Sequence, residues 1–469
     1  MVDINHFRMV NERYGRAYGD NVLRRIGEEL RAAVADTGGI VCRQEADSFL
    51  VYCPHREDYE EIIDRASIRL TDEGSSDNRI RLRMGVYTNV DKSIDIERRF
   101  DRAKMAADTV KETFVRSVGY YDDQLHKKQL YAEQLIEDFP TAIREKQFQV
   151  FYQPKFDVRP DTPVLSGAEA LVRWFHPTLG MISPDVFIPL FEENGLIQQF
   201  DLYVWRETVR QIRDWKDRLD YSIPVSVNVS RIDMYDPRIT ETLQQIVQEQ
   251  KLIGRDLPLE VTESAYTQDS AQIIETAEKL RGMGFQIEMD DFGTGYSSLN
   301  MISNLPIDAL KLDMQFIREA FKEGGNTHML EVIIGISDFL SVPVIAEGVE
   351  TEEQLHALKC LGCDLVQGYF FSKPVSAHAF EAFILQKKEA DQARLRESPK
   401  DVGAKSDEDE QFRKVKLDLI RNKAAAEEAA AAEKPSLTEE KEHTGIQLKT
   451  ASMFFVILSL LAAAALLIS

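Results

Sequence analysis

The 469-residue chain has few cysteines, fewer basic than acidic residues, and no apolar segment near its N-terminus that is typical of a signal peptide. Its four cysteines are too few for a disulfide scaffold and fit a reducing compartment. Lys and Arg number 57 against 79 Asp and Glu, which gives a formal net charge of −22. This acidic balance argues against a nucleic-acid polymer as partner, because few cations face a phosphate backbone. The N-terminal segment is mixed and charged, so we expect no signal peptide.

Two of the cysteines, Cys360 and Cys363, have C-x-x-C spacing. The sequence offers no second pair that would complete a zinc site with them. We interpret them as small apolar residues near a helix end.

One long hydrophobic run lies near the C-terminus, at Met453–Ile468, where Ser459 is the single polar residue. A helix of this length covers about 25 Å, close to the thickness of a bilayer core. We therefore predict a transmembrane anchor at 451–469, with a buried helix as the alternative. Lys441 and Lys449 precede the run, which predicts a protein at the cell membrane with its large domains cytoplasmic.

The rest of the chain divides by texture into four regions. Residues 1–121 mix helical and strand patterns, and 122–139 has the pattern of a connecting helix. Residues 140–386 alternate strands with helices. Residues 387–450 are charged and alanine-rich with few large apolar side chains, so we predict a spacer that is partly helical and partly disordered.

The region 140–386 contains eight strand-like runs, from "FQVFYQP" to "DLVQGYFF". Helical stretches separate most of them, whereas the first two are joined by the short, turn-rich "DVRPDTPVLS". The pattern predicts an α/β fold, a (β/α)8 barrel in which one strand is antiparallel to the others.

Polar side chains gather at the ends of these predicted strands. In chain order they are Gln153, Glu169, Asn228, Glu260 with Glu263, Asp290 with Asp291, Lys311, Glu347 and Gln367. Strand ends of such a barrel converge on one mouth, where catalytic residues gather. Oxygen-rich clusters suit Mg²⁺ or Mn²⁺. Asp290 beside Asp291 is well placed to bridge two ions, which suits an in-line phosphoryl displacement, and Gly293 and Gly295 let the next loop turn tightly.

The motifs "GAEALVRW", "VNVS", "LEVTES", "DDFGTGYSSL", "ALKLD", "AEGVET" and "QGYFFSKP" resemble the motif set of the EAL domain. The resemblance covers about residues 130–385. It implies a phosphodiesterase that opens the bacterial messenger cyclic di-GMP to linear pGpG with Mg²⁺ or Mn²⁺. It also implies a homodimer formed through this domain.

The resemblance assigns roles to individual residues. It implies that metal is ligated by Glu169, Asn228, Glu260, Asp290 and Asp291. Glu347 would hold or activate the attacking water with Lys311 close by, and which group takes the proton is left open. Glu263 would brace the loop from Asp291 to Ser298.

Three further residues are implied to complete the site. Gln367 would line it, and Arg173 and Gln153 would contact phosphate and base. One position departs from the family: Glu288 stands where a small apolar residue is usual. We expect it either to raise the pKa of one member of the Glu288–Asp290 pair or to pair with Lys311.

The N-terminal region resembles the GGDEF domain, the synthase of the same messenger. "VDINHFRMVNERYGRAYGD" is similar to its metal and guanine segment, so that Asp3, Asn11 and Asp20 have counterparts there. The chain begins inside what would be the first strand, without the preceding helix, which implies a truncated domain.

The signature loop of that domain is degraded, because R-x-G-G-D-E-F reads Arg43-Gln-Glu-Ala-Asp-Ser-Phe49. Glu45 and Ala46 replace the two glycines, and Ser48 replaces a metal-binding acid. The upstream R-x-x-D inhibitory site is also missing. We predict no synthase activity and a regulatory or dimerising role, with weak nucleotide sensing left open.

Two alternatives to a phosphodiesterase stay open from sequence. The first is a catalytically silent cyclic di-GMP receptor, and the second is a scaffold in which the degenerate first domain recruits partners. The retained acids at Glu169, Asp290 and Asp291 favour the enzyme.

Overall fold

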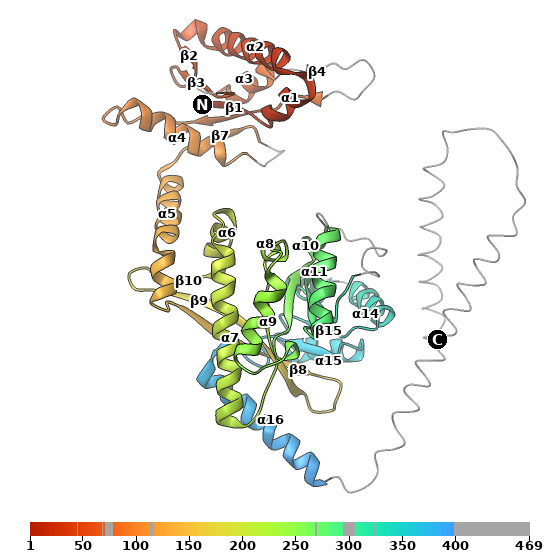
Figure 1. Ribbon diagram of the computed structural model, residues 1–469. Coiled ribbons are helices and arrows are strands. Elements are labelled where there is room, and N and C mark those ends of the chain that lie inside the picture. The colour runs from red at the N-terminus through yellow and green to blue at the C-terminus, as the bar shows by residue number, and fades with distance from the viewer. Residues whose placement is uncertain are drawn as a thin grey trace, which may run out of the picture. The chain divides into compact units, whose positions relative to one another are not determined.

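The computed structural model describes nearly all of the first 397 residues, and Figure 1 shows the arrangement of their elements. The described ranges are 1–44, 46–67, 69–70, 78–111, 116–267, 270–293, 305–322, 325 and 327–397.

The N-terminal domain is built on a five-stranded sheet with the strand order β2-β3-β1-β6-β7. The pairing is antiparallel except between β6 and β7. Its strands are β1 (Val2–Ile4), β2 (Ile40–Arg43), β3 (Phe49–Tyr52), β6 (Leu82–Val86) and β7 (Val118–Tyr120). Its α-helices are α1 (Phe7–Tyr14), α2 (Arg16–Val34), α3 (Tyr59–Ala66) and α4 (Ile96–Asp108). The short strands β4 (Arg69–Leu70) and β5 (Asn78–Arg79) pair separately.

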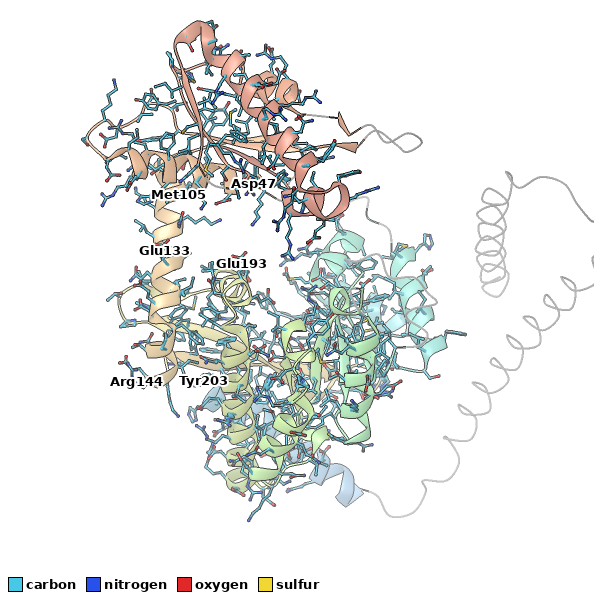
Figure 2. All side chains as sticks on the ribbon, turned by 45° about the horizontal axis from the view of Figure 1, so that its top comes forward. Asp47, Met105, Glu133, Arg144, Glu193 and Tyr203 are labelled. Carbon is cyan, nitrogen blue, oxygen red and sulfur yellow. The ribbon has the colours of Figure 1, made fainter. Side chains whose placement is uncertain are left out.

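The connecting helix α5 spans Asp123–Arg144, and Glu133 and Arg144 mark two points along it in Figure 2. Asp122 caps its start by accepting a hydrogen bond from the amide of Leu125. The helix continues five residues past its predicted end at Phe139, through Pro140. Its buried residues Leu135, Phe139 and Ala142 recur at helical spacing, so burial of this stripe outweighs the local effect of proline.

Eight strands close into the predicted barrel. The order is β9-β11-β12-β13-β14-β15-β16-β8, and β8 also pairs with β9, so the sheet has no free edge there. Only β8 runs antiparallel to its barrel neighbours, which confirms the prediction of one reversed strand. The strands are β8 (Phe148–Asp157), β9 (Val164–His176), β11 (Val225–Asn228), β12 (Leu259–Thr262), β13 (Ile287–Phe292), β14 (Ala309–Leu312), β15 (Val344–Ala346) and β16 (Leu365–Gln367).

Helices connect the parallel strands and cover the outside of the barrel (Figure 1). They are α6 (Pro184–Glu193), α7 (Ile197–Leu219), α8 (Arg231–Met234), α9 (Ile239–Glu249), α10 (Glu263–Thr267), α11 (Ser270–Gly282), α13 (Met314–Phe321), α14 (His328–Leu340), α15 (Glu352–Cys360) and α16 (Ala377–Glu397). Short strands at β10 (Gly180–Ile182) and β17 (Val375–Ser376) extend the sheet. Cys360 ends α15 and Cys363 is buried, in keeping with their interpretation as residues near a helix end.

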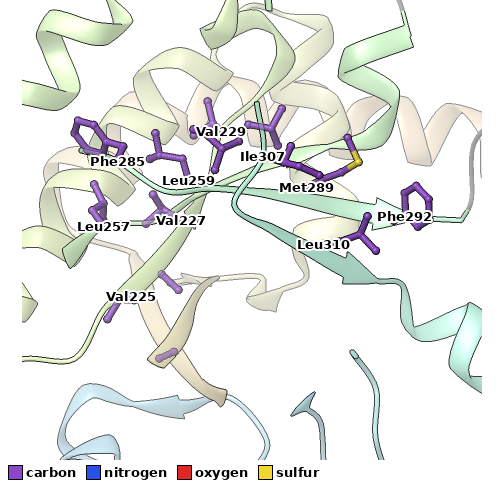
Figure 3. Packing of buried hydrophobic residues seen from close by; sticks show 14 of the residues in the cluster. Val225, Val227, Val229, Leu257, Leu259, Phe285, Met289, Phe292, Ile307 and Leu310 are labelled. Carbon is purple, nitrogen blue, oxygen red and sulfur yellow. The ribbon is translucent and has the colours of Figure 1, made fainter. Parts of the chain in front are cut away.

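The barrel core follows from strict alternation along the strands. Val225, Val227 and Val229 are buried in the layer between strands and helices, next to Leu257 and Leu259 (Figure 3). The intervening residues of the same strands face the barrel interior. This alternation places polar side chains inside the barrel while apolar ones hold the helices.

The prediction of a membrane anchor is corrected. Within the ranges that the structure describes, no helix combines the length and apolarity needed to cross a membrane. The run Met453–Ile468 that prompted the prediction lies outside those ranges. The structure therefore gives no support for an anchor at 451–469 or for the membrane localisation derived from it.

Candidate active site

Lys311, at the centre of the barrel mouth, is surrounded by acids from four strands. Its ammonium nitrogen lies 2.6 Å from Glu347, 2.8 Å from Glu260, 3.1 Å from Asp290 and 3.6 Å from Glu169. Lys311 is fully buried in the middle of β14. The structure thus brings together five of the residues that the sequence placed at strand ends.

Glu260 is shared between two lysines. One of its oxygens accepts from Lys311 at 2.8 Å and the other accepts from Lys155 at 2.8 Å and from Ser226 at 2.5 Å. Burial would raise the pKa of Glu260, but the two ammonium groups hold it well below its usual value. Glu260 is therefore a fixed carboxylate at the centre of the site.

The paired acids Asp290 and Asp291 end β13 at an irregular point. The pairing of β13 with β14 shifts register between Met289 and Phe292, and Asp291 has a left-handed φ of 57°. Such a bulge re-aims side chains that a regular strand would send to opposite faces. The amide of Asp291 donates to the carboxylate of Asp290 at 2.9 Å. Asp290 is buried and Asp291 is exposed, so the two acids project into different surroundings.

Glu263 holds the start of the loop that follows β13. Its carboxylate accepts a hydrogen bond from the amide of Gly293 at 3.0 Å. Gly293 has a φ of 101°, which favours glycine, and a Cβ there would meet the ring of Phe316 at 3.1 Å. Ser298, the far end of the predicted braced loop, lies outside the described residues.

Two glutamines form one wall of the site. The side-chain amide of Gln367 donates to Glu169 at 2.5 Å and to Gln153 at 3.1 Å, and both glutamines are buried. The side-chain amide of Asn228 lies 3.5 Å from Glu169. Arg173 lies four residues further along β9 and donates to the carbonyl of Val172, so its predicted phosphate contact is not tested by this geometry.

Two side chains of α7 form hydrogen bonds to the turn that follows Asn228. Trp205 donates its indole N–H to the carbonyl of Asn228 at 3.0 Å, and Asp201 accepts from the amide of Ser230 at 3.3 Å. Ser230 in turn donates to Asp233 at 2.5 Å. Burial, reinforced by the neighbouring Asp233, raises the pKa of Asp201 well above its usual value. Asp201 and Asp233 therefore share this turn as a buried acid pair.

The remaining acids of the site show the effect of crowding. Burial and the charge of Glu260 raise the pKa of Glu169 to about 7, against the opposing effect of Lys311. Desolvation of its carboxyl group and the neighbouring Asp290 raise the pKa of Asp291 to about 6, although the residue as a whole is exposed. Burial also raises the pKa of Glu347 well above its usual value. The acids of this cluster outnumber its buried lysines, so the cluster carries an excess of negative charge.

The oxygen donors of the site are of the kind that a divalent cation prefers. Among the described residues, no group of three His, Cys, Asp or Glu side chains has the arrangement of a metal site. Instead, the ammonium group of Lys311 lies between the carboxylates. Two buried oxygens, Oε1 of Glu347 and Oε1 of Gln367, make no hydrogen bond of regular geometry within the described ranges, although Oε1 of Glu347 lies 2.6 Å from the ammonium nitrogen of Lys311. Uncompensated charge and unused oxygen lone pairs are what Mg²⁺ or Mn²⁺ would satisfy.

Sequence reasoning missed Lys155 as a member of the cluster. The predicted strand ended at Pro154, although the alternation of Phe151, Gln153 and Lys155 on one face could have indicated an inward lysine. Lys155 lies 2.5 Å from Glu288, so the partner of Glu288 is Lys155, and the alternative of pairing with Lys311 is corrected. Burial is the first cause that raises the pKa of Glu288, and Glu260 adds to it.

The N-terminal domain has a different arrangement at its predicted metal position. Asp3 accepts a hydrogen bond from Ser48 at 3.0 Å and pairs with Arg83, whose guanidinium lies 3.0 Å away through Nε. Ala46 has a left-handed φ of 40° at a position where the resemblance implies glycine. Both oxygens of Asp3 are thus engaged by protein groups.

Two models of known protein families match the chain. Residues 136–374, just over half of the chain, match the family model of the EAL domain. The chain belongs to the EAL-domain family. Residues 1–115 match the model described as diguanylate cyclase, GGDEF domain.

Several curated relatives are similar to this EAL protein over most of its length. The cyclic di-GMP phosphodiesterase NbdA of Pseudomonas aeruginosa is 32% identical over 82% of this chain and 49% of its own length. The cyclic di-GMP phosphodiesterase PdeR of Escherichia coli is 30% identical over 81% of this chain and 58% of its own. This chain therefore spans about half the length of these relatives.

A solved structure supports the barrel of the EAL domain in the same way. The structure described as PaMucR phosphodiesterase in complex with c-di-GMP is 36% identical. It covers 53% of this chain and 99% of its own, with a TM-score of 0.50.

Proposed function

We propose that the protein hydrolyses cyclic di-GMP to linear pGpG by metal-assisted in-line cleavage of one phosphodiester bond. The observation that carries this proposal is the cluster of four carboxylates around Lys311 at the mouth of the barrel. Phosphodiesterases among the relatives, and a related phosphodiesterase with c-di-GMP bound, support the choice of substrate.

We assign the metal ligands as a set drawn from the strand ends. Two Mg²⁺ or Mn²⁺ ions would be held by Glu169, Asn228, Glu260, Asp290 and Asp291. When bound, the ions would stabilise the charge that develops on the attacking and leaving oxygens. The register shift at Asp290 and Asp291 supports a role of both acids in holding metal, because it turns these adjacent side chains away from the opposite faces that a regular strand would give them.

Glu347 and Lys311 share the proton chemistry in this proposal. Lys311 keeps its proton, because it stands among four acids, and it would stabilise the developing negative charge. Glu347 is then the carboxylate that positions the attacking water and accepts its proton. Their contact of 2.6 Å orients the Glu347 carboxylate for this task.

The remaining residues would bind substrate or hold the site in place. Gln153 and Arg173 would contact base and phosphate, Gln367 would line the site, and Glu263 would fix the loop after Asp291. The hydrogen bonds from Gln367 to Gln153 and from Gly293 to Glu263 support these roles.

A homodimer through the EAL domain belongs to the same proposal. Three apolar side chains of α14 are strongly exposed, namely Met329 at 53%, Val332 at 41% and Phe339 at 71%. Exposed apolar surface of this kind marks interaction sites. Sedimentation of wild type and Phe339→Glu tests it, because a dimer formed here should dissociate in the variant.

We further propose that the GGDEF domain is not a synthase and acts on the EAL domain as a regulatory unit. Asp3 pairs with Arg83 and Ser48, so its carboxylate would have to lose both partners to hold a metal ion. Ser48 also lacks the charge of the acid it replaces.

Turnover by the purified full chain tests the main proposal. With Mg²⁺ or Mn²⁺, cyclic di-GMP should be converted to linear pGpG, separated by chromatography. Glu169→Ala should lower the rate by orders of magnitude, whereas Glu193→Ala on the exposed side of α6 should not. Binding of cyclic di-GMP without cleavage in either metal would instead establish the receptor alternative.

A further inference from the structure

Lys155 is a buried charge that the proposed mechanism does not use. It lies on β8, is 4% exposed, and donates to Ser226 at 2.8 Å, Glu260 at 2.8 Å and Glu288 at 2.5 Å. An ammonium group has three hydrogens, so these three acceptors satisfy it fully. Its position is therefore fixed by three strands.

The contact between Lys155 and Glu288 crosses the barrel. In the closed strand order, three strands separate β8 from β13 in either direction, so these two strands lie on opposite walls. Glu260 on β12 lies beside this crossing and receives Lys155 on one oxygen and Lys311 on the other. The Lys155–Glu288 pair thus forms a polar layer directly beneath the candidate metal ligands.

A cavity borders the other side of this layer. It has a volume of about 160 Å³ and lies where the parallel strands begin, opposite the mouth of the barrel. Its lining includes Lys155, Ser226, Glu288, Pro224, Pro258 and Pro343. The pair therefore separates the site from the opposite opening, and Glu288 reaches this opening with 12% of its side chain exposed.

Charge explains why both members of the pair are present. A lysine beneath Glu260 fixes that carboxylate, but its positive charge alone would oppose cations bound just above. Glu288 neutralises this charge from the far side, away from the mouth. We propose that Lys155 and Glu288 are a matched pair of positioning residues that hold Glu260 for metal binding. This inference rests on the metal binding that the proposed function requires, and not on the cleavage itself.

The pairing is tested by the thermal unfolding of the full chain in EDTA. Glu288→Gln and Lys155→Met should each lower the midpoint by about 5 °C, because each leaves a buried charge with less compensation. The double variant should return to within about 2 °C of wild type, since it buries neither charge. Additive losses would overturn the pairing.

The positioning role is tested by the Mn²⁺ concentration above which the midpoint begins to rise, because this concentration reflects the dissociation constant for Mn²⁺. The double variant keeps the net charge of the site, so a change in this concentration reports on position. We expect an increase of about tenfold, typical for loss of groups that orient ligands. An unchanged value, or a wild type that does not respond to Mn²⁺, would overturn the role.

A matched control exists on the surface, where Lys279 and Glu275 of α11 form an exposed pair at 2.7 Å. Lys279→Met with Glu275→Gln also conserves charge and should change neither measurement. These readouts need no turnover. A wild type that binds Mn²⁺ without cleaving cyclic di-GMP would therefore refute the proposed function while leaving this inference standing.

Discussion

The ammonium nitrogen of Lys311 lies 2.6 Å from Oε1 of Glu347, and in the described part of the chain this ion pair is the polar contact of an oxygen that makes no hydrogen bond of regular geometry. Oε1 of Glu347 thus has Lys311 as its electrostatic partner and keeps a lone pair that can accept a hydrogen bond. This is the arrangement expected of a carboxylate that must receive a proton from a bound water.

Lys311→Met should therefore abolish turnover and disturb the cluster. Removing the ammonium leaves Glu169, Glu260, Asp290 and Glu347 without their shared cation, so repulsion should lower the thermal midpoint in EDTA. We expect the rate of pGpG formation to fall by at least about 100-fold. Lys216→Met on the exposed face of α7 is the control. Activity within a few-fold of wild type would contradict the role of Lys311.

Glu263 should be needed for activity more than for folding. Glu263→Ala leaves the amide of Gly293 without this acceptor, at about 1 kcal/mol of stability. The start of the loop beside Asp291 should shift, and turnover should fall by about tenfold or more. Glu263→Gln keeps an oxygen acceptor and should recover most of the loss. Equal defects in both variants would show that the charge of Glu263, not this hydrogen bond, matters.

Asp201 should make stability depend on pH. Its pKa is raised by burial and by Asp233, so the folded state holds a proton that the unfolded chain releases as pH rises above about 4. Stability is full below that pH and declines as pH rises toward the folded-state pKa. Asn mimics the protonated acid, so Asp201→Asn should unfold at least about 3 °C above wild type at about pH 8.

The control for this prediction is Asp161→Asn on an exposed loop. It should follow the wild-type profile from about pH 5 to 8. A profile for Asp201→Asn that runs parallel to wild type would show that the raised pKa does not contribute to stability.

The GGDEF domain should make no product from GTP. Incubation of the full chain with GTP and Mg²⁺ should give no cyclic di-GMP above background, because Ser48 contributes no charge and Asp3 is paired with Arg83. A phosphodiesterase-inactive Glu169→Ala background prevents product from being consumed during the assay. Detectable product that disappears on Asp3→Ala would refute the assignment.

The sequence by itself determined the barrel and which polar side chains could gather at its mouth. Alternation of Val225, Val227 and Val229 with polar residues fixed which side faces inward, because side chains of a strand point to opposite faces in turn. Acids and amides at strand ends could be assigned to one mouth, since parallel strands of a barrel end on the same side. Both features depend on neighbouring residues and on the two-residue repeat of a strand, so they can be predicted from the sequence.

Tertiary structure alone decided which charges meet. Lys155 and Glu288 are 133 residues apart in the chain and lie on opposite walls, so no local pattern could pair them. The left-handed φ of Asp291 likewise depends on how β13 pairs with β14. Sequence supplies the residue types and the facing side, but closure of the barrel sets the distances, and Coulomb interactions in a buried site depend on distance.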